Sequence, residues 1–405
     1  MAADLLARRG RAGTLRVTLV DHSPEALASA TERCRRTTGR APRTLVADLS
    51  VPREISRLAA EHDVVLGALA SRLGFATLQA VIEARRPYAD ISFMAEDPLE
   101  LSALARRRGV TAVVDCGVAP GMSNLLAGQA TRLLEPCERL DIMVGGLPVQ
   151  RRHPFQYKAA FSPFDVIEEY TRPARIVEGG RVVVREALGG IEPVDLPGVG
   201  TVEAFDTDGL RSLARTLKVP FMRERTLRWP GHAGLMKAFR DAGLFGDAPI
   251  TVGRGPQAVR VSPREVTSAL LFPAWQYEPG EADLTVMRVT AEGRLKGPAA
   301  GSGASRGRRA SPGRSAQLSW DLLDHLDPTT GFTSMARTTA FPCTIVARLL
   351  ASGGLRRPGV NPPEFLADDP RLVELVLAEL RRRGVVFEAS IALRETEQPA
   401  GGDSA

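Results

Sequence analysis

The sequence predicts an α/β fold: a doubly wound parallel sheet, followed by a second α/β domain with a mixed sheet. Two observations support this fold class. Through residues 15–114, short and continuously apolar segments alternate with helical ones, which is typical of a parallel sheet covered on both faces. Beyond about residue 120 the apolar segments acquire polar partners and longer loops, which indicates a more open, mixed sheet.

We predict a first domain over residues 1–120. Residues 1–10 resemble a helix, and Ser23 and Pro24 begin the next one as N-cap and first helical residue. The remaining elements follow the alternation of short apolar runs with amphipathic stretches. Strands are predicted at 15–20, 44–48, 63–69, 88–92 and 111–114, and helices at 23–34, 51–60, 75–85 and 98–108.

The second domain is predicted over residues 121–330. Residues 297–316 are rich in Gly, Ser and Arg, so we expect a disordered insertion there. Residues 331–392 are helical in pattern. Residues 393–405 are a polar tail.

Composition excludes several classes of protein. The 405 residues are 44% hydrophobic and 25% charged, as in ordinary globular proteins. No signal peptide and no membrane-spanning apolar run is present, so we expect a cytoplasmic protein without a membrane partner. The net charge of +6 comes from arginines spread along the chain, so we expect no nucleic-acid partner.

The cysteines are Cys34, Cys116, Cys137 and Cys343, which are far apart in the sequence. They form neither a CxxC pair nor a cluster with histidine, so we predict reduced thiols and no metal site.

A dinucleotide site is predicted at the ends of the parallel strands. Asp21 closes the first predicted strand, where a carboxylate accepts hydrogen bonds from the adenosine ribose; the alternative is a turn or helix-capping residue. This carboxylate repels a 2′-phosphate, so we expect NAD, with NADP less favoured. The predicted cofactor-binding residues are Asp21, Asp48, Gly67, Ala68, Ser92 and Met94.

The GxGxxG loop that should precede Asp21 by about twenty residues is absent from the sequence. Residues 1–10 then read as the helix that follows this loop. We therefore expect the first strand to be missing, and the natural protein to begin roughly thirty residues upstream of Met1.

Six segments resemble the saccharopine dehydrogenase family, and within it the lysine 6-dehydrogenase type. They are ADISFMAEDP (89–98), VVDCGVAPGMSN (113–124), YKAAFSPFDVIEEYTRPAR (157–175), VGTVEAFDTDGLR (199–211), TLRWPGH (226–232) and TSMARTT (333–339). The resemblance extends from Met1 to about residue 390. It implies a Rossmann domain, a second domain over 121–330 with substrate contacts and subunit pairing, a helical return of residues 331–392 onto the first domain, and a homodimer. It also implies transfer of a hydride from the C–N carbon of an amino acid, the ε-amine of L-lysine, to NAD.

This reaction needs a neutral amine, a general base and charged groups that hold the amino acid. Lys158 and His232 are the predicted bases. Lysine is rare in this chain, and we expect an apolar surround to lower the pKa of Lys158. The alternatives are a surface ion pair for Lys158 and a core or turn histidine for His232.

Arginines and carboxylates of the second domain are the predicted substrate contacts. Arg172, Arg175 and Arg211 are candidates for the substrate carboxylate, of which we expect one to bind it and the others to form ion pairs. The predicted substrate-binding residues are Arg172, Glu203, Asp208, Arg211 and Asp90. The alternative for Asp208 is a helix cap, and for Asp115 and Cys116 it is packing between domains.

Two rival functions stay open. Oxidation of saccharopine uses the same hydride step on a secondary amine, and a roomier pocket with an additional arginine would favour it. A truncated, inactive scaffold subunit is the rival that the missing loop favours. A substrate screen separates oxidation of lysine from oxidation of saccharopine, and the coding sequence upstream of Met1 tests the inactive scaffold.

Overall fold

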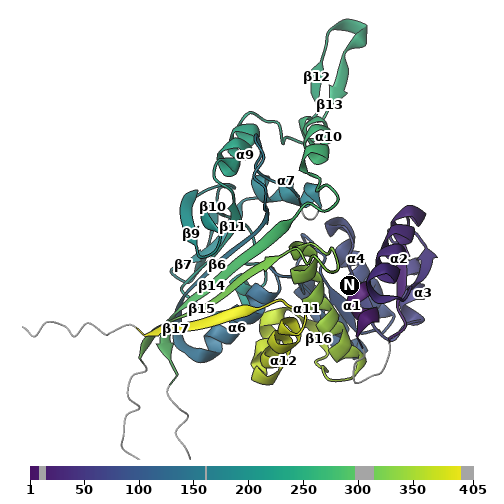
Figure 1. The fold of residues 1–405 in the computed structure, drawn as a ribbon, viewed down its shortest axis with the longest axis vertical. Helices are drawn as coiled ribbons and strands as arrows, with labels where there is room; N and C mark the ends of the chain where they lie inside the picture. Colours follow the sequence, from purple (N-terminus) through teal and green to yellow (C-terminus); the bar gives the residue numbers. More distant parts are fainter. Residues whose placement is uncertain (9–14, 160–161, 297–313, 394–405) are drawn as a thin grey trace, which may run out of the picture.

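The computed structural model describes residues 1–8, 15–159, 162–296 and 314–393 (Figure 1). It confirms the predicted α/β class with one parallel part and one mixed sheet. Most of the insertion predicted at 297–316 lies outside the described residues, as does the tail beyond Leu393. Residues 315 and 316 do not belong to an insertion, because they begin a strand.

The parallel part consists of two sheets. Strands β1 (Thr18–Asp21) and β2 (Arg43–Val46) pair with each other. A second sheet has the order β16-β5-β4-β3, with all its pairs parallel. Within the described residues β1 and β3 are not hydrogen-bonded to each other. The strands of the second sheet are β3 (Val65–Gly67), β4 (Tyr88–Asp90), β5 (Thr111–Val113) and β16 (Gly359–Asn361).

Local sequence explains where the helices of this part begin and end. The Ser23 side chain accepts a hydrogen bond from the Ala26 amide at 3.1 Å, as predicted for the N-cap of α2 (Pro24–Thr38). Gly39 ends that helix with φ +68°, a conformation that glycine adopts at little cost. The other helices of this part are α1 (Ala2–Ala7), α3 (Pro52–Ala60), α4 (Ser71–Glu83), η1 (Pro98–Leu101) and α5 (Ser102–Arg108).

The second part is built on a nine-stranded mixed sheet. Its central path is β17-β15-β14-β6-β11-β10-β9, and β7 and β8 extend it from β11. Only β6 and β11 pair in parallel within this sheet as described. The strands are β6 (Leu134–Pro148), β7 (Ala174–Glu178), β8 (Arg181–Arg185), β9 (Glu192–Leu196), β10 (Gly200–Asp206), β11 (Phe221–Arg228), β14 (Asp283–Leu295), β15 (Ser315–His325) and β17 (Phe387–Leu393).

Helices cover this sheet, and a hairpin projects beyond it (Figure 1). The largest core cluster joins α6 to the strands β6 and β14 and to α11, through residues such as Leu126, Leu140, Met287 and Val346. The hairpin of β12 (Ile250–Val252) and β13 (Val259–Val261) leads into α10. The helices are α6 (Met122–Leu133), α7 (Pro163–Thr171), α8 (Leu213–Thr216), α9 (His232–Asp241), α10 (Pro263–Trp275), α11 (Ser334–Ala351) and α12 (Pro370–Arg381), with 3-10 turns η2 (Gly255–Gln257) and η3 (Pro363–Asp368).

The C-terminal segment joins both parts. The prediction of a purely helical return over 331–392 is wrong in one respect, because this segment also supplies β16 to the parallel sheet and β17 to the mixed sheet. The strand β16 lies between α11 and α12, and β17 follows α12. The helical period therefore dominates the sequence pattern of this segment. Within the described residues, no helix is long and apolar enough to span a membrane.

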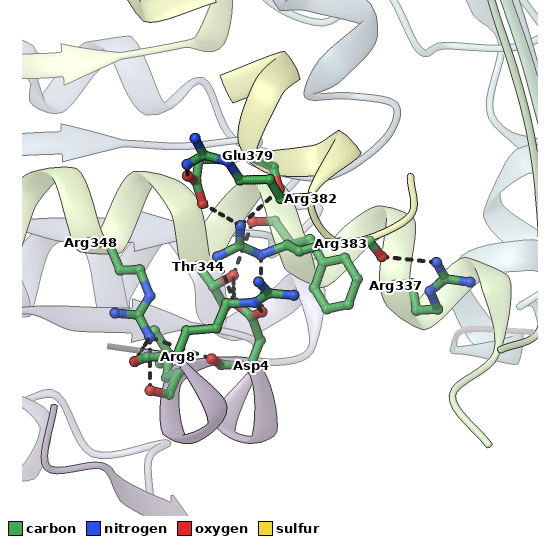
Figure 2. Close-up of polar contacts among 10 residues, drawn as sticks. Asp4, Arg8, Arg337, Thr344, Arg348, Glu379, Arg382 and Arg383 are labelled. Carbon is green, nitrogen blue, oxygen red and sulfur yellow. Dashed lines mark hydrogen bonds and ion pairs between the residues drawn. The ribbon is translucent and has the colours of Figure 1, made fainter. Parts of the chain in front are cut away.

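Figure 2 shows how the first helix is attached to this C-terminal segment. Asp4 of α1 accepts hydrogen bonds from Arg383 Nε at 2.9 Å and from the Thr344 hydroxyl at 2.7 Å. Arg348 donates to the Leu5 and Arg8 carbonyls at 2.9 and 2.8 Å, at the C-terminal end of α1. A cation there offsets the partial negative charge of the helix end. We call this group the Asp4 cluster.

Candidate functional site

The carboxyl ends of β4 and β5 place two buried carboxylates next to each other. Asp90 ends β4 and accepts hydrogen bonds from the Ser92 amide at 2.9 Å and from its hydroxyl at 2.7 Å. Burial raises the pKa of Asp90 to about 6, and the neighbouring charge of Asp115 adds to this rise. Ligands of open α/β sheets bind beyond this edge.

Arg211 reaches this edge from the loop that follows β10. Its side chain is only 5% exposed, and its Nη2 lies 3.5 Å from Oδ1 of Asp115. At this distance the two form an ion pair without a hydrogen bond. Burial raises the pKa of Asp115, and the charge of Arg211 only partly opposes this rise. The Phe93 ring covers the guanidinium at 4.6 Å.

This group is incompletely paired. Nε and Nη2 of Arg211 and Oδ1 of Asp115 are buried without a hydrogen-bond partner in the described part of the chain. Both residues also have positive φ, +52° each, which is uncommon outside glycine. Buried polar groups are normally paired, and strained backbone gathers where ligands bind. We call Arg211, Asp115 and Phe93 the Arg211 site.

Arg172 lies nearby but is already engaged. Its guanidinium lies 5.7 Å from the centre of the Phe93 ring, the ring that also covers Arg211. The Arg172 Nη2 is also 3.3 Å from Glu168, a residue that Arg264 contacts at 2.5 Å. Arg211 is therefore the less satisfied of the two arginines.

His232 lies in a completed network. Its Nδ1 is 2.8 Å from the Phe155 carbonyl, and its Nε2 is 2.8 Å from the Tyr170 hydroxyl, which Arg228 Nε also contacts. Burial, reinforced by the charge of Arg228, lowers the pKa of His232 to about 3. A neutral imidazole that donates to Phe155 must accept from Tyr170. These are the contacts of a core histidine, and its role as a base stays a prediction.

The expected apolar surround of Lys158 is wrong. Its ammonium donates to the Gln276 carbonyl at 2.7 Å and lies 3.4 Å from Glu281. The side chains of Lys158 and Glu281 are 11% and 6% exposed. Glu281 Oε1 and the Tyr277 hydroxyl are buried without a partner among the described residues. Lys158 therefore lies beside a second incompletely paired group.

Glu203 and Asp208 do not meet the Arg211 site as free carboxylates. Glu203 accepts from the amides of Gly231 at 2.8 Å and Ala233 at 3.4 Å, at the start of α9. Both oxygens of Asp208 are held by Arg175, at 2.7 and 2.8 Å. A carboxylate that is bonded in this way to a helix start or an arginine has a structural role. The structure thus favours the ion pair for Arg175 that the sequence left open.

The predicted cofactor residues divide into an outer and an inner set. Asp21 ends β1 with a side chain 41% exposed and accepts from the Ser23 amide at 2.9 Å. Asp48 follows β2, is exposed, and accepts from the Ser50 amide at 2.8 Å. Ala68 is exposed directly after β3. Asp21 Oδ1 also lies 3.1 Å from His22 Nδ1, and contacts of Asp21 and Asp48 with ribose hydroxyls stay predictions.

The inner set is packed within the protein. A β-carbon on Gly67 would collide with the Tyr88 hydroxyl and the Asp90 carboxylate. Ser92 and Met94 are buried against Gly74 of α4, where a β-carbon would lie 3.1 Å from both side chains. Their close packing positions the loop after β4, and a cofactor contact by these residues stays a prediction.

Sequence reasoning missed several residues of this region. Phe93 carries no pattern that marks it, and Asp115 was weighed only as interdomain packing. The position of Asp115 two residues beyond β5 was a usable signal, because Asp90 ends the neighbouring parallel strand β4 at the same edge of the sheet. Within the described residues no group of His, Cys, Asp and Glu has metal-binding geometry.

Comparisons with known proteins agree with this architecture. The Saccharopine dehydrogenase NADP binding domain matches residues 1–113, and the Saccharopine dehydrogenase C-terminal domain matches residues 117–385. The mitochondrial alpha-aminoadipic semialdehyde synthase of Bos taurus is 23% identical over 417 residues, 84% of this chain but 42% of that protein. The chain therefore spans less than half of the length of this relative.

Two further proteins show similar sequence or fold. Saccharopine dehydrogenase [NADP(+), L-glutamate-forming] of Schizosaccharomyces pombe is 25% identical over 157 residues, covering 39% of this chain and 29% of that protein. The structure of apo saccharopine dehydrogenase (L-Glu forming) from Saccharomyces cerevisiae superposes with a TM-score of 0.72 over 96% of both chains, at 17% identity. With the domain matches, these findings confirm the resemblance: the chain belongs to the saccharopine dehydrogenase family of oxidoreductases, which carry a nicotinamide-nucleotide binding domain.

Proposed function

We propose that the protein transfers a hydride from the C–N carbon of an amino acid to NAD, with the ε-amine of L-lysine as the reacting group and an aminoadipate semialdehyde-type product. The Arg211 site carries this proposal. It contains a buried cation and a buried anion that form an ion pair at 3.5 Å, while Arg211 Nε and Nη2 and Asp115 Oδ1 lack hydrogen-bond partners among the described residues. A zwitterionic amino acid supplies hydrogen-bond partners for these atoms, a carboxylate for Arg211 and an ammonium for Asp115.

Each side chain of the site has a defined part in binding. Arg211 donates to the substrate α-carboxylate through Nε and Nη2, which point to a bidentate contact. Asp115 accepts from the α-ammonium, and its pKa, raised by burial, falls when that cation arrives. Phe93 excludes water from the ion pair, which strengthens it. NAD, when bound, supplies the acceptor for the hydride.

Saccharopine is the second candidate substrate. Arg172 lies on the same Phe93 ring as Arg211 and offers an additional carboxylate contact. The name of the Schizosaccharomyces pombe relative also includes this activity. Against it stands the contact of Arg172 with Glu168, which leaves Arg211 as the one arginine of the site with unpaired nitrogens in the described residues. This difference favours a substrate with one carboxylate.

Substrate kinetics test the proposal. Arg211→Ala should raise the KM for L-lysine by about 10- to 100-fold, since a hydrogen bond to a charged group contributes roughly 1.5–3 kcal/mol. Arg185→Ala, which removes an exposed pair with Glu178, is the control and should leave the KM unchanged. If saccharopine is oxidised more efficiently than lysine, and Arg172→Ala raises its KM, the second candidate is correct. Unchanged kinetics in Arg211→Ala contradict both.

NAD preference is a separate part of the proposal. Asp21 and Asp48 place two carboxylates at the outer strand ends, where the 2′-phosphate of NADP would be repelled. The matching family domain is described as NADP binding. A comparison of kcat/KM with NAD and with NADP therefore tests the proposed preference. The wild-type kcat/KM should be higher with NAD, and Asp21→Ser should narrow the difference. A higher kcat/KM with NADP overturns this preference. We also expect a homodimer in the cytoplasm, and sedimentation tests the dimer.

A further inference from the structure

Glu224 of β11 lies beneath the segment that carries Arg211. The Thr207 hydroxyl is hydrogen-bonded to Glu224 Oε2, and the Thr207 amide donates to the Glu224 carbonyl at 3.1 Å. A β-carbon on Gly209 would collide with the Glu224 carboxyl group. Residues 207–209 therefore rest directly on this carboxyl group, and Arg211 follows two residues later.

The contact is inside the protein. Glu224 is only 5% exposed. Carboxylates without an arginine partner are rarely buried this deeply. The neighbouring Thr226 hydroxyl completes the group at 3.0 Å from Thr207. Because Gly209 has no side chain, its backbone can approach the Glu224 carboxyl group closely. The backbone of the segment is thus fixed before it turns through the positive φ of Arg211.

The charges around Glu224 favour its neutral form. Burial raises the pKa of Glu224 to about 8, and the charges of Glu169 on α7 and Asp208 in the loop add to this rise. The hydrogen bond from Thr207 and the charge of Arg228 on β11 oppose it. At neutral pH the carboxyl group is protonated, and ionisation at higher pH places a negative charge under the loop.

We propose that Glu224 is a positioning residue that clamps residues 207–209 on β11 and so presents the Arg211 guanidinium to the substrate carboxylate. This inference rests on the proposed function of Arg211. It adds a dependence on pH, because only the neutral carboxyl group can sit among Glu169 and Asp208 without repulsion.

Three variants test the clamp through KM, kcat and thermal stability. Glu224→Ala should raise the KM for the amino acid by about tenfold, the effect of one lost buried hydrogen bond of roughly 1.4 kcal/mol, with kcat nearly unchanged. Glu224→Gln keeps a neutral group of the same shape and should retain the wild-type KM at pH 7. Glu192→Gln, whose partner Arg225 is a neighbour of Glu224 on β11 but points to the other face, is the matched control.

The pH profile gives a readout that a purely structural role would not move. The wild-type KM should rise above about pH 8, and Glu224→Gln should remove this rise. In the double variant Arg211→Ala/Glu224→Ala, the KM should equal that of Arg211→Ala alone, because both changes remove the same contact.

The outcomes separate this inference from the proposed function. If Arg211→Ala leaves the KM unchanged, the proposed function fails. If Arg211→Ala raises the KM while Glu224→Ala does not, the clamp is wrong. If Glu224→Ala does not fold, Glu224→Gln decides the question: the same alkaline rise in this variant and in the wild type overturns the clamp.

Discussion

Two clusters of buried charge in this protein differ in how completely their carboxylates are paired. In the Asp4 cluster both carboxylate oxygens are bonded, by Arg383, Arg8 and Thr344 (Figure 2). Burial alone would raise the pKa of Asp4, but these partners outweigh it and hold the pKa below its usual value. In the Arg211 site burial prevails, and the pKa of Asp115 is raised.

The difference separates a structural ion pair from a binding site. A buried charge with a complete set of partners holds elements together, here α1 to α11 and α12, and needs nothing more. A buried charge without partners costs free energy in every molecule that carries it. Such a group is expected where a ligand completes the pairing, which supports the Arg211 site as the binding site that we propose.

The two predicted bases, Lys158 and His232, also differ in how completely their surroundings are paired. Replacing them gives the largest effect that we expect, on kcat. We propose that Lys158, in its neutral form, is the proton acceptor; it lies beside Glu281, whose Oε1 lacks a partner among the described residues, as does the Tyr277 hydroxyl. Lys158→Met should then lower kcat by about 10²- to 10⁴-fold, as is typical for loss of a general base. His232→Gln should change kcat by less than about tenfold, since both ring nitrogens of His232 serve the core.

Stopped-flow measurement of hydride transfer checks this prediction, with thermal stability as the control for folding. A kcat that falls in His232→Gln but not in Lys158→Met would reverse the assignment. Near-wild-type kcat in both variants would remove the two residues from the chemistry.

The second prediction concerns stability. Arg383→Ala removes a side chain that is 0% exposed from its pair with Asp4. We expect a loss of about 3–5 kcal/mol in the free energy of unfolding, as for other broken buried pairs. The control is Arg382→Ala, the next residue along the chain, whose side chain is 72% exposed and whose loss should cost less than about 1 kcal/mol. Urea unfolding measures both, and equal losses would contradict the account.

The third prediction concerns the pH dependence of stability. The pKa of Asp4 is lowered by folding, so its contribution is present above the unfolded pKa and is lost as pH falls below about 4. The pKa of Glu224 is raised to about 8, so its contribution is present below about 4.3 and is lost as pH rises through 8.

Two variants separate the contributions of Asp4 and Glu224 to the pH dependence of stability. Glu224→Gln should remove a slope of about 1 kcal/mol per pH unit between pH 5 and 8, and Asp4→Asn should flatten the acid limb. Unfolding curves recorded across this range provide the measurement. A slope in Glu224→Gln that matches the wild type would show that Glu224 is already ionised at neutral pH.

The sequence was enough to predict the fold class and the parallel strands, because the apolar periodicity and the Ser23 cap are local. It also selected Arg211 and Asp90 as candidate substrate contacts, since arginine chemistry and strand ends are visible without a structure, and these roles stay predictions. It did not reveal that Arg175 neutralises Asp208. That pair joins residues 33 positions apart, and no local pattern encodes it.

A core histidine was one of the alternatives for His232, but its partners, the distant Phe155 carbonyl and Tyr170 hydroxyl, were equally hidden. Glu224 was missed for a similar reason: its contact is with a glycine, which has no side chain to suggest a partner. Short strands such as β16 were hidden by the helices on either side. Long-range pairing thus accounts for most of what the sequence could not predict.

Calorimetric titration of L-lysine into the protein with saturating NADH tests the central claim most directly. The wild type should bind lysine, Arg211→Ala should bind it about 10- to 100-fold more weakly, and Arg382→Ala should match the wild type. If Arg211→Ala binds lysine as tightly as the wild type does, the unpaired guanidinium is not the carboxylate anchor, and the interpretation of the Arg211 site is wrong.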